Sequence, residues 1–177
     1  SLKSFIISHI NFIIYHFFCR MADAIGFLPE SLVLSQQTHT TNIRLVTKED
    51  KGKGFTKPLD YENIDGLITN VPGLTLATFY ADCVPLFFVD PVSRSLGLSH
   101  AGWPGTLKRM GAKTVPQMVR EFHTDPEHLR VAIAPSICQD CYEVSEEVAA
   151  EFKKEFARYA DERLVYRTKE GKYHLNL

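Results

Sequence analysis

The stretch ADCVPLFFVDPVSRSLGLSHAGWPGTL, residues 81–107, decides the fold that the sequence predicts. Two apolar runs within it, 86–90 and 96–100, have the composition and length of strands. Pro85 prevents the turn before the first run from becoming helical. After the second run, AGWPGT forms a tight turn into a segment, 106–122, whose apolar residues approximate one helical face. We expect Thr106 to cap this helix.

Similar patterns extend on both sides of this stretch. Further strands are predicted at 32–36, 43–47, 66–70, 74–80, 129–134, 164–168 and 173–177, the run 129–134 being a buried one. A second helix is predicted at 145–159, opened by Ser145, and the Gly/Lys-rich segment 48–58 reads as an exposed loop. Several strands precede each helix, so the pattern predicts a mixed α/β (α+β) layered domain with mixed β-sheets flanked by helices.

Length and composition limit the classes of protein to consider. A chain of 177 residues fits one domain, which we place at 19–177 and expect to be incomplete at its C-terminus, because the last strand stops without a cap or tail. A net charge of −1 with scattered Lys and Arg argues against nucleic-acid binding. Four cysteines are too few for a disulfide scaffold and favour a reducing cytoplasm. The sequence contains no Gly-rich nucleotide loop.

The apolar segment 1–18 has a different character. Its run FIISHINFIIYHFF, 5–18, is shorter than the ~20 residues that span a bilayer, and no small-residue cleavage site follows it. We therefore expect a buried or mis-assigned terminal segment of uncertain status and no membrane anchor.

Three side chains could form a metal site. His39 and His100 follow or end predicted strands, and Cys83 lies in a turn between two apolar strands. Two imidazoles and one thiolate suit zinc, and three protein ligands leave a fourth position open for water or substrate. The spacing alone does not require a metal, and core histidines with an inert buried thiol are the simpler interpretation of it.

Four motifs in order, QQTHT, ADCVPLFFVDP, HAGWPGT and APSICQDCYEV, resemble the laccase-domain (polyphenol oxidase) family, whose members are read as purine nucleoside phosphorylases. The resemblance implies a layered mixed α/β fold and one zinc ion held by His39, Cys83 and His100, with Gln37 completing the Q-x-H motif. It also implies cleavage of adenosine, inosine or methylthioadenosine with phosphate, and adenosine deamination as a further activity.

Two departures from the family pattern bear on activity. Pro104 stands where the family usually has Arg, which removes a fixed cation that could hold phosphate. The family also continues beyond the strand that matches 173–177, into a C-terminal segment with its own polar and basic residues.

Other residues receive roles with alternatives. Asp82 is either a catalytic base or a turn residue bonded to its own backbone. Trp103 either stacks on a purine or packs over the core, and Arg109 either replaces the missing cation or is solvated. We assign Cys83, His100 and Asp82 to catalysis, and Gln37, Trp103 and Arg109 to substrate binding. The pair Cys138 and Cys141 is interpreted as structural rather than as a redox pair or half of a zinc clamp.

Three alternatives to a zinc enzyme stay open. One is a metal-free thiol hydrolase with Cys83 as nucleophile and His100 as base. Another is a copper-dependent phenol oxidase, although no other histidine cluster for further copper ions is visible. The third is an inactive binding relative. We expect a purine nucleoside and phosphate as small-molecule partners, and neither nucleic acid nor a membrane. The sequence indicates no oligomeric state and does not choose between phosphorolysis and deamination.

Overall fold

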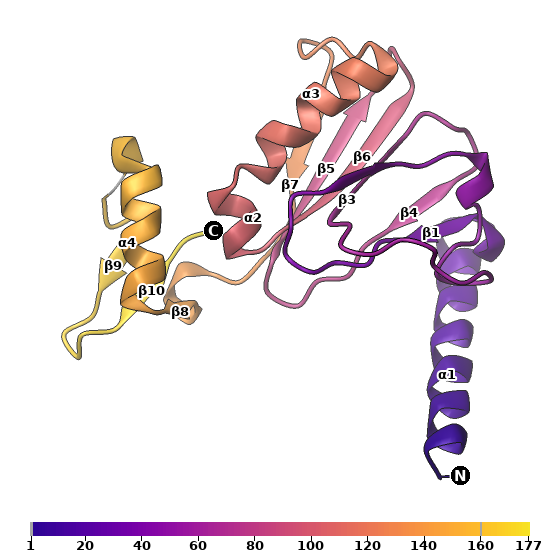
Figure 1. Ribbon diagram of the computed structural model, residues 1–177, viewed down its shortest axis with the longest axis horizontal. Helices are drawn as coiled ribbons and strands as arrows, with labels where there is room; N and C mark the ends of the chain where they lie inside the picture. Colours follow the sequence, from indigo (N-terminus) through magenta and orange to yellow (C-terminus); the bar gives the residue numbers. More distant parts are fainter. Residues whose placement is uncertain (1, 160) are drawn as a thin grey trace.

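A five-stranded mixed sheet forms the centre of the computed structural model, which describes residues 2–159 and 161–177, with side chains from residue 14 onward (Figure 1). Its strand order is β2 (Ile43–Leu45), β3 (Gly66–Thr69), β6 (Ser95–Ala101), β5 (Val84–Asp90) and β7 (Arg130–Ile133). Strands β2 and β3 are parallel, and the other pairs are antiparallel. The predicted strands at 86–90 and 96–100 are confirmed as the β5–β6 pair at the middle of this sheet.

Successive side chains of β3 point to opposite faces of the sheet and enter different cores. On one face, Ile68 and Phe88 pack against Met118 and Phe122 of helix α3 (Met110–Phe122). On the other face, Leu67 packs with Val33 of β1 (Leu32–Leu34) and with Val46. Strand β1 pairs in parallel with β4 (Thr75–Ala77). The predicted fold class, mixed α/β with mixed sheets flanked by helices, is confirmed.

The helix predicted over 106–122 is confirmed over Met110–Phe122 as α3, but its predicted start at Thr106 is wrong. Helix α2 (Trp103–Leu107) ends before Arg109, which adopts a left-handed backbone conformation with φ of 62°, and α3 then begins. Thr106 lies inside α2 and caps neither helix. The break has a packing reason, because Leu107 faces a C-terminal apolar cluster whereas Met110 is fully buried against β5 and β6.

The strand predicted at 129–134 is confirmed as β7, but its predicted burial is wrong. All four residues of β7 are exposed, and Ile133 keeps 73% of its accessible surface. The strand lies at the edge of the sheet and pairs only with β5, so its apolar composition does not indicate its burial.

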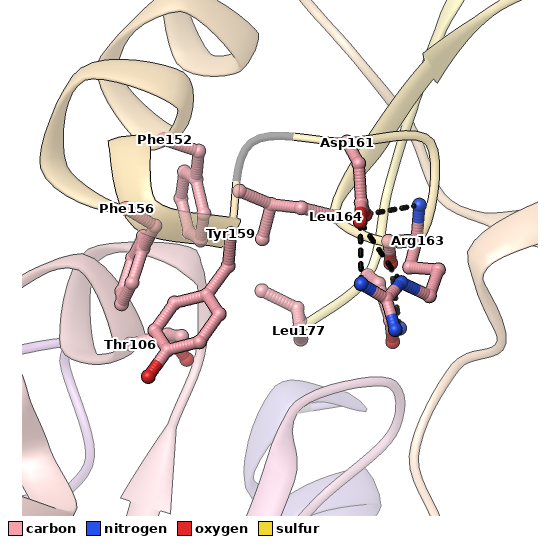
Figure 2. Close-up of a pocket in the computed structure, with 9 residues that line it drawn as sticks. Thr106, Phe152, Phe156, Tyr159, Asp161, Arg163, Leu164 and Leu177 are labelled. Carbon is pink, nitrogen blue, oxygen red and sulfur yellow. Dashed lines mark hydrogen bonds and ion pairs between the residues drawn. The ribbon is translucent and has the colours of Figure 1, made fainter.

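A smaller layered unit follows the central sheet. Helix α4 (Glu146–Glu155) packs on an antiparallel sheet of order β8 (Glu143–Val144), β10 (Tyr173–Leu175) and β9 (Val165–Arg167). The Ser145 side chain accepts a hydrogen bond from the backbone of Val148 and caps α4, as predicted. A cavity of about 430 Å³ lies between this unit and α2, with Phe156, Tyr159 and Leu177 around it (Figure 2).

The N-terminal segment forms one long helix, α1 (Leu2–Ile25), that projects from the rest of the molecule (Figure 1). The expectation that 5–18 is buried lies outside the described side chains for residues 5–13. Beyond them Phe18 is buried against Leu32 and Leu34, whereas Tyr15 and Phe17 are exposed. None of the helices in the described part of the chain has the length and apolar character that crossing a membrane requires.

Short 3-10 turns connect these elements. They lie at Pro29–Ser31, Lys48–Asp50, Gln139–Cys141 and Ala157–Tyr159.

Candidate functional site

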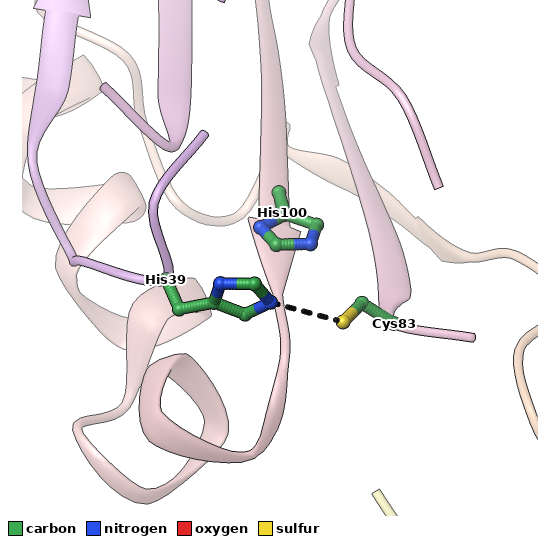
Figure 3. Close-up of side chains that lie close together, drawn as sticks. All are labelled: His39, Cys83 and His100. Atoms are coloured by element: carbon green, nitrogen blue, oxygen red, sulfur yellow. Dashed lines mark hydrogen bonds between the residues drawn. The ribbon is translucent and has the colours of Figure 1, made fainter. Parts of the chain in front are cut away.

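His39, Cys83 and His100 lie together at one end of the central sheet (Figure 3). Cys83 directly precedes β5 and His100 lies near the end of β6. Because these strands are antiparallel, with Pro85 opposite His100, the two side chains come to the same sheet end. One ligand atom from each of the three residues lies within 4.8 Å of the others, and Cys83 Sγ is 3.8 Å from His39 Nε2. The convergence expected from the motifs is therefore present. The donor atoms lie farther from one another than they would around a bound zinc ion, whose bonds to each donor are ~2.0–2.3 Å long.

A glycine leaves room for this arrangement. A Cβ atom added at Gly102 would lie 2.7 Å from His39 Cδ2 and 2.9 Å from Cys83 Sγ. Contacts this short require neighbouring atoms to move, and these neighbours are two of the three clustered side chains. The glycine of the HAGWPGT turn therefore keeps the space between the imidazole and the thiol open.

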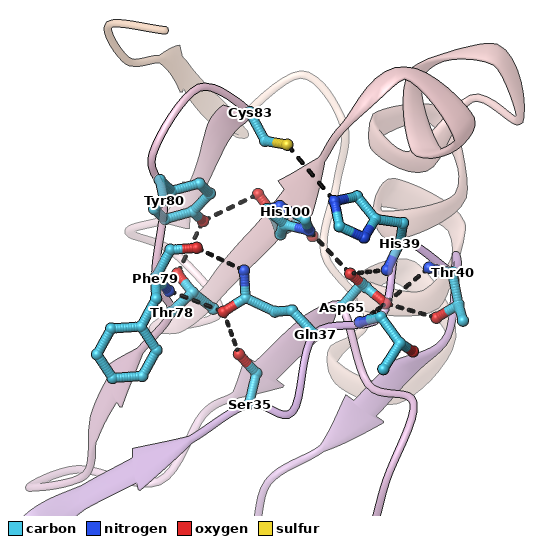
Figure 4. A network of polar contacts seen from close by, with 12 residues as sticks. Ser35, Gln37, His39, Thr40, Asp65, Thr78, Phe79, Tyr80, Cys83 and His100 are labelled. Carbon is cyan, nitrogen blue, oxygen red and sulfur yellow. Dashed lines mark hydrogen bonds and ion pairs between the residues drawn. The ribbon is translucent and has the colours of Figure 1, made fainter.

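Asp65 organises the cluster, and sequence reasoning missed it. Its buried carboxylate accepts hydrogen bonds from the backbone amides of Thr38, His39 and Thr40 and from the Thr40 hydroxyl (Figure 4). The same carboxylate lies 2.8 Å from His100 Nδ1, so Nε2 is the nitrogen of His100 left for a ligand. The one available sequence signal is that Asp65 stands immediately before a buried strand. A buried carboxylate there needs hydrogen-bond partners.

These contacts have two consequences. His39 has a left-handed backbone conformation, with φ of 63°, which is uncommon for a residue with a side chain, and the bonds from Asp65 hold it there. Burial by itself raises the pKa of Asp65, but the hydrogen bonds from His100 and from Thr40 and Thr38 outweigh it and lower the pKa to about 2. Asp65 is therefore an anion at neutral pH and supplies negative charge beside His100.

The Cys83 thiol is half-buried, and the described residues that line the pocket around it include no Lys or Arg that would favour its ionised form. Burial raises its pKa, and the negative charges of Asp82 and Asp65 raise it further. A divalent cation between Cys83 and the two imidazoles would favour the thiolate, since a coordinating thiol loses its proton. The donor set therefore fits a cation better than it fits a free reactive thiol.

A pocket of about 550 Å³ opens above the three side chains. Gln37, Phe79 and Asp82 line it together with the cluster. The Gln37 side chain is held at both ends of its amide, because its oxygen accepts from Ser35 and from the Phe79 amide while its nitrogen donates to the Phe79 carbonyl (Figure 4). Gln37 thus holds the pocket wall through Phe79, and Asp82 lies exposed at the rim.

Tyr80 is a second residue that sequence reasoning missed. Its ring lies against the His100 ring, with 5.5 Å between centroids, and its hydroxyl donates to the Ser99 carbonyl and accepts from Thr78. Burial raises the pKa of Tyr80. The Tyr80 ring therefore limits the movement of the His100 side chain.

Trp103 and Arg109 do not line this pocket. Trp103 packs against the C-terminal cluster of Phe152 and Leu175. Arg109 forms an ion pair with Glu155, at 3.1 Å, and its guanidinium lies over the Phe156 ring. Their substrate-binding roles stay predictions to which this geometry lends no support.

Pro104 occupies the first turn of α2, where a fixed φ and a missing amide hydrogen are tolerated. The residues that line the pocket in the described part of the chain include no Lys or Arg.

Comparison with known proteins agrees with the motif resemblance. Purine nucleoside phosphorylase YlmD of Bacillus subtilis is 39% identical over 72% of this chain and 46% of its own length. Adenosine deaminase RL5, from an unidentified prokaryote, is 33% identical over 89% of this chain and 60% of its own length. The crystal structure of Bacillus licheniformis hypothetical protein YfiH superposes with a TM-score of 0.84 at 32% identity, covering 92% of this chain and 61% of that one.

The chain thus spans about half to three fifths of the length of these relatives. The family model described as multi-copper polyphenol oxidoreductase laccase matches residues 15–177. By this match, the four ordered motifs and the shared fold, the chain belongs to the laccase-domain family.

Proposed function

We propose that this chain carries the metal site of a zinc-dependent enzyme that acts on purine nucleosides. The observation that carries the proposal is the convergence of His39, Cys83 and His100 at the floor of an open pocket. The names of the relatives support the substrate class, since two reactions on purine nucleosides, phosphorolysis and adenosine deamination, appear among them.

The residues present fit zinc in three respects. The donor atoms are two nitrogens and one sulfur, a set that suits a borderline-soft cation. Asp65 holds His100 by Nδ1, which is the carboxylate–histidine support common at zinc sites. Three ligands with a pocket on the remaining side leave a position open for substrate or water, as in catalytic zinc sites.

A bound zinc ion would supply Lewis-acid chemistry, polarising a substrate atom or making a water molecule more acidic. The chain's own residues do the rest. Asp65 orients His100 and fixes the backbone at His39, and Tyr80 limits the movement of the His100 ring. We assign proton acceptance from an incoming nucleophile to Asp82, whose carboxylate lies on the exposed rim of the same pocket.

The geometry favours deamination over phosphorolysis within this chain. Phosphate needs positively charged donors, and neither Lys nor Arg is among the described residues that line the pocket. Pro104 cannot supply one, and Arg109 is committed to Glu155 and Phe156. Phosphorolysis by this chain alone is therefore expected to be weak.

The deciding experiment measures products and metal together. Purified chain is freed of metal with a chelator and reloaded separately with zinc or copper. Each form is then incubated with adenosine and inosine, with and without phosphate. The proposal expects zinc to restore conversion of adenosine. Activity that persists without metal would instead indicate a thiol hydrolase, and phenol oxidation restored by copper would indicate the oxidase. Zinc bound without turnover of any nucleoside would indicate a binding relative.

A further inference from the structure

Cys138 and Cys141 lie outside the pocket on a tight turn between β7 and β8. Cys138 directly precedes the 3-10 turn Gln139–Cys141 and Cys141 is its last residue, with the Cys141 amide donating to the Cys138 carbonyl at 3.1 Å. Both thiols are free and exposed. Exposed thiols on a turn add nothing to a core, so the geometry argues against the structural role predicted for this pair.

The turn is held in place by the β9–β10 hairpin. The Gln139 side chain donates to the Glu162 carbonyl at 2.7 Å, and the Gln139 carbonyl lies 3.3 Å from His174 Nδ1. The Tyr166 hydroxyl donates to the Asp140 carboxylate. Both residues between the two cysteines are thus bonded to the hairpin or to the segment just before it, which fixes the turn that carries the two thiols.

The two thiols are not equivalent. Interaction with the neighbouring Cys141 side chain lowers the pKa of Cys138, and the backbone amides of Cys141 and Asp140 act in the same direction. Interaction with the Cys138 side chain has the opposite effect on Cys141 and raises its pKa. Of the two thiols, Cys138 is therefore the one that ionises more readily, and the thiolate is the reactive form.

We propose that Cys138 and Cys141 form a redox-active dithiol that reacts with small disulfides such as glutathione disulfide, with Cys138 as the attacking thiol and Cys141 as the resolving thiol. This pair is separate from the proposed metal site and does not depend on the proposed function. The supporting geometry is the closed C-x₂-C turn, its attachment to the hairpin and the exposure of both sulfurs.

The reaction balances with glutathione disulfide as the oxidant. The Cys138 thiolate attacks one sulfur of glutathione disulfide, forming a mixed disulfide and releasing one glutathione thiolate. Cys141 then loses its proton to solvent and attacks the Cys138 sulfur, releasing the second glutathione. Two electrons pass to glutathione disulfide, which becomes two thiols, and the protein gains one disulfide.

The turn also contacts the loop that carries Cys83. The Ile137 amide, one residue before Cys138, donates to the Asp82 carbonyl at 3.0 Å. An assay must therefore separate reaction at Cys83 from reaction at the turn. Trypsin allows this separation, because cleavage after Arg130 and Lys153 places Cys138 and Cys141 on one peptide that lacks Cys83.

The test is equilibration of the purified chain in glutathione buffers of increasing oxidised fraction. The reaction is quenched with acid, free thiols are alkylated, and tryptic peptides are weighed by mass spectrometry. The wild-type peptide 131–153 is expected to pass from two alkylated cysteines to none, with an internal disulfide. A Cys83→Ala variant should give the same titration, because the pair acts without Cys83.

Two single variants test the assigned order. Cys141→Ser should accumulate glutathione on Cys138, and Cys138→Ser should acquire glutathione on Cys141 more slowly, because the backbone amides that favour the Cys138 thiolate do not act on Cys141. The proposal is overturned if peptide 131–153 of the wild type stays fully alkylated in the most oxidising buffer. Equal rates for the two variants would overturn the assignment of Cys138 as the attacking thiol.

Discussion

Asp65 Oδ1 lies 2.8 Å from His100 Nδ1, and the same carboxylate binds the backbone amide of His39. One buried side chain therefore fixes two of the three proposed metal ligands. The two histidines come from distant parts of the chain, so their relative position depends on Asp65 as much as on the strands that carry them.

Replacement of Asp65 tests this relationship. Asp65→Asn keeps the shape of the side chain but removes its charge, and we expect zinc affinity to fall by about 10- to 100-fold, the usual cost of losing a carboxylate that supports a histidine ligand. The measurement is a competitive zinc titration on variants whose circular dichroism shows a folded chain. Glu62→Gln, which alters an exposed acid in the same loop, is the control. Unchanged zinc affinity in folded Asp65→Asn would show that the Asp65 carboxylate does not support the metal ligands.

Gly102→Ala tests the space between the ligands. The added Cβ would press on His39 and Cys83, so zinc affinity should fall by roughly tenfold or more, on the scale seen when the support of a ligand is disturbed. The matched control is Gly105→Ala in the same turn, whose Cβ would meet only ordinary contacts, the nearest at 3.5 Å. Equal zinc affinity for the two variants would show that the site accommodates the methyl group without loss.

Pro104→Arg tests the missing anion site. If position 104 faces the phosphate, a guanidinium there contributes ~1.5–3 kcal/mol, which corresponds to about 10- to 100-fold in phosphate affinity or rate. We expect weak phosphorolysis of inosine by the wild type and a phosphate-dependent gain in the variant, whereas Pro126→Arg should show none. Strong, saturable phosphorolysis by the wild type would mean that its phosphate is held elsewhere.

The stability of the chain should depend on pH through Asp50. Burial raises the pKa of Asp50, but hydrogen bonds from Lys53, the Thr47 amide and Arg44 outweigh it and lower the pKa from 3.8 to about 2. A carboxyl group with a lowered folded-state pKa stabilises the fold fully above its unfolded value. It loses that contribution as pH falls through the folded value.

The measurement compares the free energy of unfolding of metal-free wild type and Asp50→Asn across this range. The difference between them should be constant above about pH 5, where the carboxyl is ionised in both states, and should shrink as pH falls from there towards 2. Glu62→Gln, an exposed acid, should show no comparable change over the range. A difference between wild type and Asp50→Asn that does not vary with pH would contradict the assignment.

Those parts of the site that depend on single motifs could be predicted from the sequence. His39, Cys83 and His100 each stand beside a strand end and a small-residue turn, and the antiparallel β5–β6 pair brings the last two together. Asp65 could not be predicted, because its role exists only when β3 lies beside β6 and the 38–40 loop folds over it.

The errors in the fold have similar causes. The break at Arg109 arises because Leu107 and Met110 face different cores, and helical periodicity cannot show two cores. Ile133 is exposed because β7 lies at the edge of the sheet. A run of apolar residues does not show whether its strand lies at an edge or in the middle. The sequence leaves Trp103 either stacked on a purine or packed over the core, and in the structure it packs with Phe152.

The most direct test of the account is the zinc content of variants in which one cysteine at a time is replaced, measured by elemental analysis after dialysis against trace zinc. The account predicts one zinc per chain for the wild type, Cys138→Ala and Cys141→Ala, and a loss of zinc in Cys83→Ala with the fold retained by circular dichroism. Zinc retained by Cys83→Ala and lost from Cys138→Ala and Cys141→Ala would contradict it, because the metal would then lie at the C-x₂-C turn.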